Sequence, residues 1–93
     1  MEKRLRAIVK GKVQGVGYRY YVLDNALSLK LRGFCRNLRN GDVEVVAEGE
    51  EGALEALVSF LKRGPAMSRV DEVIEVWQNP KNEFLNFQIT STY

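Results

Sequence analysis

The amino-acid sequence predicts an α+β fold in which two helices pack on one face of an antiparallel sheet. One observation is that apolar residues recur at every second position over residues 5–10, as in a strand buried on one face. Another is that two longer segments repeat apolar residues at helical spacing. The order is strand, helix, strand, strand, helix, strand, then a short fifth strand. Right-handed crossovers turn this order into a ferredoxin-like split β-α-β sandwich.

The first half of the chain begins with an alternating strand over residues 5–10, in which every second side chain is apolar. Three glycines mark residues 11–17 as a loop. A helix is predicted over residues 19–30, because apolar side chains recur along one side and no Gly or Pro interrupts it. This stripe consists of Tyr18, Val22, Ala26 and Leu29.

A hairpin follows. Residues 33–39 and 43–48 are predicted strands, joined by Asn40-Gly41, a pair that tolerates the positive φ of a tight turn. Residues 70–77 form the fourth predicted strand, and residues 84–90 a short fifth one.

A second helix separates the third and fourth strands. Glu50 and Glu51 suit a helix N-terminus, Lys62 and Arg63 suit its C-terminus, and Gly64-Pro65 ends it. Its apolar stripe consists of Leu54, Leu57, Val58 and Leu61.

Length and composition limit the class of protein. The 93 residues, 45% of them hydrophobic, suit a single domain over residues 1–93 with one modest core. No stretch reaches the roughly 18–20 apolar residues of a membrane span. The first four residues lack the apolar segment of a signal peptide. The one cysteine, Cys35, forms no internal disulfide, so we expect a cytoplasmic protein.

Missing residue types restrict the chemistry. The chain has no His, and one Cys makes no thiolate cluster, so we expect neither a metal site nor a cofactor. Residues 1–42 carry ten Lys/Arg and three Asp/Glu, a net charge of +7. Residues 43–93 carry four Lys/Arg and nine Asp/Glu, a net charge of −5. A basic first half suits an anionic ligand, although a solvated strand face would look the same.

The most informative segment runs from Gly11 to Arg19, between a strand and a helix N-terminus. Consecutive main-chain N–H groups in such a turn form a nest for an anion, and the helix end adds unpaired donors. Gly15 and Gly17 permit unusual backbone conformations and a close approach. Arg19 adds a charged fork that suits phosphate oxygens. The alternative is a tight turn next to a surface arginine.

Residues 11–19, Gly-Lys-Val-Gln-Gly-Val-Gly-Tyr-Arg, resemble the acylphosphatase signature at every fixed position. Residues 33–38, Gly-Phe-Cys-Arg-Asn-Leu, resemble the second block of that family. Gly64-Pro65 and residues 68–70 also lie where the family has similar residues. The resemblance therefore covers nearly the whole chain and implies one acylphosphatase-like domain.

The resemblance also implies roles for particular residues. Arg19 would bind the phosphate, and Asn37 would position the attacking water. Cys35 replaces the commoner Val and is expected to be a small core residue. Tyr20 occupies a variable position near the mouth of the site. The phosphate cradle would consist of the main-chain amides of Gln14, Gly15, Val16, Gly17, Tyr18 and Arg19.

The implied reaction is hydrolysis of the carboxyl–phosphate anhydride of small acyl phosphates, such as acetyl phosphate or 1,3-bisphosphoglycerate. The leaving carboxylate has a conjugate acid with a pKa of about 4 to 5 and needs no general acid, so the missing His is no obstacle. Inorganic phosphate or sulfate should bind as a product-like ligand. We expect a monomer without nucleic-acid or membrane partners.

Other classes share features of the sequence. RNA-recognition modules have the same element order, and Arg32-Gly33-Phe34 echoes their aromatic motif. In those modules, however, the motif lies on the third strand, which here has no aromatic residue and carries Glu44 and Glu48. An accessory domain of a larger enzyme is a second alternative, although a chain spanning Met1 to Tyr93 favours a free-standing enzyme. A ferredoxin-like metal carrier would need a Cys pair.

Overall fold

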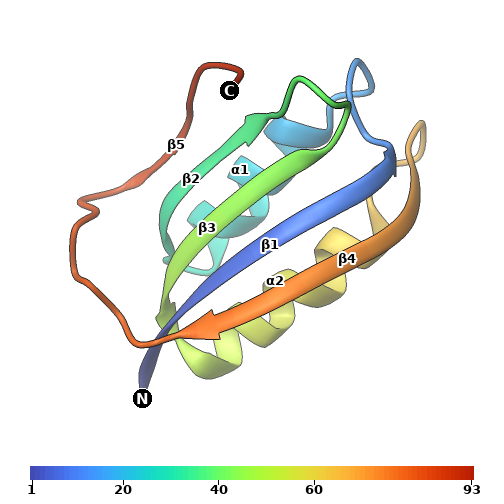
Figure 1. The fold of residues 1–93 in the computed structure, drawn as a ribbon. Helices are drawn as coiled ribbons and strands as arrows, with labels where there is room; N and C mark the ends of the chain where they lie inside the picture. Colours follow the sequence, from blue (N-terminus) through green and yellow to red (C-terminus); the bar gives the residue numbers. More distant parts are fainter.

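The computed structural model describes residues 1–93 and has two layers, a five-stranded sheet and a pair of helices (Figure 1). The strands lie in the order β4-β1-β3-β2-β5. The predicted α+β fold and element order are confirmed. The elements are β1 (Glu2–Lys12), α1 (Tyr18–Ser28), β2 (Arg32–Asn37), β3 (Val43–Glu50), α2 (Glu51–Arg63), β4 (Arg69–Gln78) and β5 (Phe87–Ile89).

The sheet is mixed, so the prediction of a wholly antiparallel sheet was wrong for its last strand. β1 to β4 pair antiparallel, but β5 pairs parallel to β2. β4 and β5 lie at opposite edges, and residues 79–86 cross the end of the sheet where β2 begins (Figure 1). The chain therefore enters β5 from the same end as β2, which makes the two strands parallel.

β1 is longer than predicted and includes Gly11, which was expected to open the loop. Gly11 pairs with Val70 of β4 after a register shift next to Lys10. Its φ is 131°, and a Cβ there would collide with the carbonyl of Arg69. The neighbouring strand thus excludes a side chain at this position, and the loop proper is residues 13–17.

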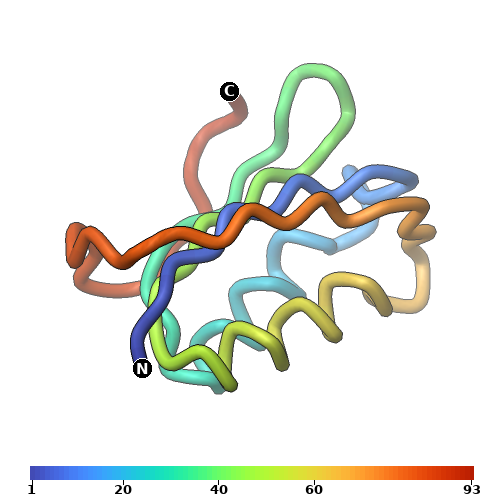
Figure 2. The backbone as a smooth tube through the Cα atoms, turned by 60° about the horizontal axis from the view of Figure 1, so that its bottom comes forward, coloured from blue at the N-terminus to red at the C-terminus, as the bar shows by residue number.

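The core lies between the helices and the sheet (Figure 2). Leu5, Ala7 and Val9 of β1 face the helices, as their alternation predicts, residues 43–49 of β3 are all buried, and both helical stripes are buried. Leu29 is the exception, because it follows α1 as its C-cap and is half-buried. Full burial of one such apolar side chain contributes about 1.5–3 kcal/mol. The most deeply buried residues include Leu5, Ala7, Val9, Tyr18, Val22, Ala26, Val45, Leu54, Leu57 and Leu61.

The strand register brings the end of β2 close to the end of β1. Val43 of β3 pairs with Val9 on one side and with Asn37 on the other. Residues directly opposite each other point to the same face of a sheet, and Val9 and Val43 are buried on the helix side. Asn37 therefore points to the helix face, at the end of the sheet where loop 13–17 leaves β1.

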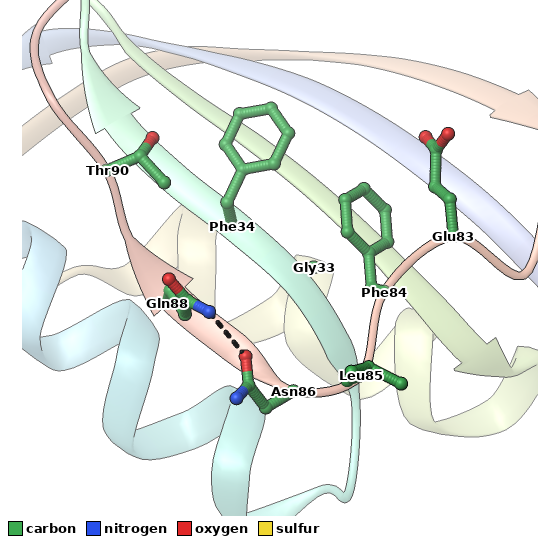
Figure 3. A pocket seen from close by; sticks show the side chains of 8 residues that line it. All are labelled: Gly33, Phe34, Glu83, Phe84, Leu85, Asn86, Gln88 and Thr90. Carbon is green, nitrogen blue, oxygen red and sulfur yellow. Dashed lines mark hydrogen bonds between the residues drawn. The ribbon is translucent and has the colours of Figure 1, made fainter.

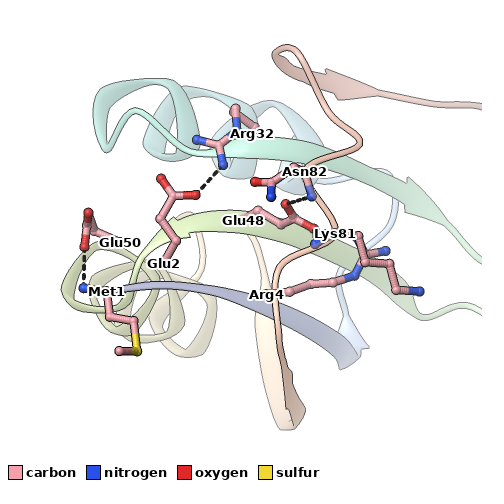
Figure 4. A network of polar contacts seen from close by, with 8 residues as sticks. All are labelled: Met1, Glu2, Arg4, Arg32, Glu48, Glu50, Lys81 and Asn82. Atoms are coloured by element: carbon pink, nitrogen blue, oxygen red, sulfur yellow. Dashed lines mark hydrogen bonds and ion pairs between the residues drawn. The ribbon is translucent and has the colours of Figure 1, made fainter.

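A fully buried carboxylate fastens residues 79–86 to the opposite face (Figure 4). Glu48 accepts hydrogen bonds from the main-chain N–H groups of Lys81 and Asn82, both at 2.9 Å. It also pairs with the Arg4 guanidinium at 2.7 Å. Burial alone would raise the pKa of the Glu48 carboxyl, but these hydrogen bonds together hold that pKa below its ordinary value.

Replacing Glu48 by Gln should lower the free energy of unfolding by about 1–3 kcal/mol at pH 7, because it removes the buried one of the two carboxylates that pair with Arg4 and leaves only the more exposed Glu83, at 2.8 Å. A carboxylate with a lowered pKa stabilises the folded state above its unfolded-state pKa and loses this contribution on protonation. The difference in urea-unfolding free energy should therefore close as the pH falls from about 5 to about 2.

The control for this experiment is Glu55→Gln, at an exposed position of α2, which should unfold like wild type. A difference between Glu48→Gln and wild type that persists unchanged at about pH 2 would contradict the assignment.

Candidate functional site

Loop 13–17 takes its shape from two glycines in the left-handed region. Gly15 has a φ of 72° and Gly17 a φ of 77°. A Cβ at either position would meet no atom within 4 Å. Backbone conformation therefore requires the glycines here, as the sequence predicts, and open space lies beside both of them.

The main-chain N–H groups of this loop make no hydrogen bonds within the protein. None of the N–H groups of Gln14, Gly15, Val16 and Gly17 donates to a protein acceptor, and the first α1 hydrogen bond runs from Tyr21 N to Gly17 O at 3.1 Å. The N–H groups of a first helical turn have no intrahelical partner either. Consecutive free donors next to the positive end of a helix form an anion-binding arrangement.

Arg19, the second residue of α1, adds a half-buried guanidinium to this end of the helix. It forms no ion pair, whereas several arginines elsewhere are matched by carboxylates. The matched set is Arg4, Arg6, Arg32, Arg36 and Arg69. The positive charge of Arg19 is therefore available to a bound anion.

Asn37, the last residue of β2, presents an unsatisfied side-chain amide. Its Oδ1 is buried and has no hydrogen-bond partner. Its main-chain carbonyl does have one, the N–H of Tyr93 at 3.0 Å. A buried amide oxygen without a protein partner is costly unless a water or ligand supplies one, and the other such side-chain atom is Thr90 Oγ1, just after β5.

The fold brings the predicted site residues to one end of the molecule. Val13, the first residue of the loop, and Tyr18, the residue that follows it, are both buried in the core. The Tyr18 hydroxyl donates to the Leu61 carbonyl at 2.8 Å, which ties α1 to α2. The Cys35 thiol donates to the Arg19 carbonyl at 3.6 Å, which ties the first turn of α1 to β2 two residues before Asn37.

Sequence reasoning missed what the side chain of Gln14 does, because only its main-chain amide was expected to matter. Gln14 Nε2 donates to the carbonyls of Leu38 at 2.7 Å and Asp42 at 2.8 Å. Both acceptors lie in the turn between β2 and β3. A glutamine among glycines was the available signal, since it is the one long polar side chain in the loop.

Tyr20 and Cys35 occupy contrasting environments. Tyr20 is 66% exposed at the first turn of α1, as expected for a residue near the mouth. Cys35 is fully buried, as expected for a core residue. Burial raises the pKa of its thiol to about 12.

The two surface clefts lie elsewhere. One, of about 320 Å³, is lined by Phe34 of β2 and by Phe84 and Leu85 of the segment before β5 (Figure 3). The other lies beside Trp77 and Gln78. A phosphoryl group is small, and a nest of N–H groups can bind it at a loop without a deep cleft.

Two further features concern metals and membranes. No three His, Cys, Asp or Glu side chains gather as a potential metal site. Neither helix combines the length and the apolar character that a membrane crossing requires.

The chain is similar to known proteins over nearly all its length. A family model described as acylphosphatase matches residues 5–89. An acylphosphatase of Thermobifida fusca is 48% identical over 89 residues, which cover 95% of this chain and 98% of that protein. The crystal structure of acylphosphatase from Bacillus subtilis has a TM-score of 0.92 at 38% identity and covers 95% of this chain and 98% of that one. Full-length HypF, in a phosphate- and nucleotide-bound form, has a TM-score of 0.90 at 31% identity over 99% of this chain and 12% of that one.

Alkylation should separate a structural Cys35 from a reactive one. A thiol with a pKa near 12 stays protonated at pH 8, and the thiolate is the reactive form. Iodoacetamide should therefore leave the folded protein unlabelled at pH 8 and label it fully in urea, as measured by mass spectrometry. Rapid labelling of the folded protein would show that the thiol is accessible and would contradict its burial.

Proposed function

The chain belongs to the acylphosphatase family of hydrolases, and we propose that it hydrolyses the carboxyl–phosphate anhydride of small acyl phosphates. The products are a carboxylate and inorganic phosphate. The observation that carries the proposal is the row of N–H groups in loop 13–17 that have no protein acceptor, next to a guanidinium that has no carboxylate.

The loop and Arg19 act as the phosphate site. Main-chain N–H groups of residues 14–19 donate to the phosphoryl oxygens, and the fork of Arg19 donates to two of them. The same donors stabilise the charge that develops on these oxygens during transfer. In this way the chain's own groups supply the positive charge that the reaction needs.

The leaving group explains why so few residues suffice. A departing carboxylate is stable at neutral pH and needs no proton donor. The chain has no His to act as a general acid, and this substrate class does not require one. A phosphate monoester with an alkoxide leaving group would require one, so acyl phosphates fit the residues present.

Asn37 positions the attacking water. An amide is not basic at neutral pH, so its oxygen can only accept a hydrogen bond from water and orient it. The buried Oδ1 of Asn37, which has no partner in the protein, supports this role. The proton of the water passes to a phosphate oxygen of the substrate.

The partners follow from this chemistry. The substrate is a small molecule whose acyl part lies near exposed Tyr20, and inorganic phosphate or sulfate binds in the same loop as a product-like ligand. We propose no nucleic-acid partner, because basic residues on the open sheet face are neutralised. There, the two carboxylate oxygens of Glu44 form ion pairs with Arg6 Nε at 2.8 Å and with Arg36 Nε at 2.7 Å.

Replacing Arg19 by Ala tests the phosphate site. Loss of one preorganised donor lowers the rate by about 10²–10³-fold, and loss of the charge adds to this, so kcat/KM should fall by at least about 10³-fold. The inhibition constant of inorganic phosphate should rise by about 10–100-fold, because hydrogen bonds to charged groups contribute about 1.5–3 kcal/mol. The measurement is phosphate release from an aryl carboxyl-phosphate in the presence of a chelator.

Arg32→Ala, at the opposite end of β2, is the matched control and should keep kcat/KM near the wild-type value. If Arg19→Ala stays within a few-fold of wild type, the phosphate site has been assigned to the wrong residue.

Replacing Asn37 by Ala tests the water-positioning role. Here kcat should fall by about 10²-fold, because the nucleophile loses its orientation. The inhibition constant of inorganic phosphate should change by less than about 3-fold, since phosphate binds elsewhere. Asn86→Ala, exposed before β5, provides the comparison. A large loss of phosphate affinity with intact kcat would refute the role.

A further inference from the structure

The side chain of Gln14 joins the phosphate loop to the turn that follows Asn37. Both N–H groups of its Nε2 are used, one toward Leu38 O at 2.7 Å and one toward Asp42 O at 2.8 Å. Gln14 is half-buried, so these hydrogen bonds are partly shielded from water. The two acceptors lie 24 and 28 residues after Gln14 in the sequence, so the contact is long-range.

The turn that receives Gln14 is held by hydrogen bonds within itself and to β1. Leu38 N donates to Asp42 O at 2.8 Å, and Gly41 N donates back to Leu38 O at 3.1 Å. The Asp42 carboxylate accepts hydrogen bonds from Lys10 Nζ of β1 at 2.7 Å and from Asn40 Nδ2 at 3.1 Å. The two carbonyls that Gln14 contacts are therefore fixed relative to both β1 and β2.

Loop 13–17 has few other attachments. Its main-chain N–H groups make no hydrogen bond to the protein, and Gly15 and Gly17 have no side chain. Val13 is buried and Val16 packs at the margin of the core. Gln14 provides the loop's only side-chain hydrogen bonds, and both of them go to the β2–β3 turn.

The acceptors of Gln14 flank the water-positioning residue. Leu38 follows Asn37 directly, and Asp42 precedes Val43, the residue that pairs with Asn37 across the two strands. A shift of the loop away from these carbonyls would change the separation between the phosphate cradle and Asn37. A misplacement of about 1 Å can lower a rate about 10²-fold.

Building on the function proposed above, we propose that Gln14 is a positioning residue that holds the phosphate loop at the distance from Asn37 that in-line attack by water requires. The amide suits this role because it supplies two uncharged donors to two carbonyls. A carboxylate would repel both carbonyls, and Asn would be one methylene too short.

The test compares Gln14→Met with Gln88→Met. Gln88 lies on β5 and donates only to the neighbouring Asn86 side chain at 2.8 Å, so the same substitution there removes an amide without touching the site. We expect kcat of Gln14→Met to fall about 10–100-fold, with the inhibition constant of inorganic phosphate within about 3-fold of wild type. Equal kcat values for the two variants would overturn the inference, and so would a phosphate affinity that falls in parallel with kcat.

A double-mutant cycle with Asn37→Ala supplies a readout that a purely structural role would not change. If Gln14 acts through Asn37, adding Gln14→Met to Asn37→Ala should lower kcat by less than about 3-fold. Additive losses would overturn the inference. Should Gln14→Met fail to fold, Gln14→Asn, which keeps the polar amide but not its reach, carries the same comparison.

The same assays separate this inference from the proposed function. If the wild-type protein releases no phosphate from the acyl phosphate, the proposed function fails and the role of Gln14 fails with it. If the wild type is active and Asn37→Ala is impaired while Gln14→Met matches its control, only the role of Gln14 is refuted.

Discussion

The proposed chemistry depends on one constraint, that the N–H groups of residues 14–17 stay free of protein acceptors. Gly15 and Gly17 are exposed and Gln14 and Val16 are half-buried, so these donors stay available because the loop keeps a conformation in which they bond to no protein acceptor. The left-handed conformations of Gly15 and Gly17 shape the loop locally. Buried Val13 and Tyr18 fix its two ends. The sheet and helices thus supply the stability that the loop itself lacks.

The pairing of charges also leaves the loop end of the molecule available to an anion. On the open face of the sheet, buried Glu44 and Glu48 neutralise arginines that would otherwise attract anions there. At the first turn of α1 no carboxylate pairs with Arg19. The charge of Arg19 therefore stays available to a small anion at the end of the molecule where the loop donors also lie.

Most of the fold could be predicted from the sequence, because strand alternation, helical stripes and turn residues all indicated the same arrangement. The stripes of both helices are buried as expected, apart from Leu29, which is displaced when α1 ends at Ser28. The direction of β5 could not be predicted, since it depends on the path of residues 79–86 across the sheet. Gly11 was assigned to the loop because the approach of Arg69 from β4 leaves no local signal.

The site was only partly accessible from sequence. Gly15, Gly17 and Arg19 lie in one short segment, so their proximity follows from chain connectivity alone. The placement of Asn37 on the helix-covered face, at the end of the sheet near that segment, depends on the register of β1, β3 and β2. The contacts of Gln14 depend on how close loop 13–17 lies to the β2–β3 turn. This is a tertiary detail that no sequence periodicity encodes. The roles of these residues stay predictions until they are tested.

The anchor formed by Glu48 also bears on how the last strand reaches its place. The entropy lost on closing a loop grows with its length, and a parallel strand of three residues offers few ladder bonds in return. By accepting hydrogen bonds from Lys81 and Asn82, Glu48 fixes the connection 79–86 and leaves only residues 83–86 between this anchor and β5. A single glutamate on a central strand thereby lowers the entropy that the last strand must lose to pair at the far edge of the sheet.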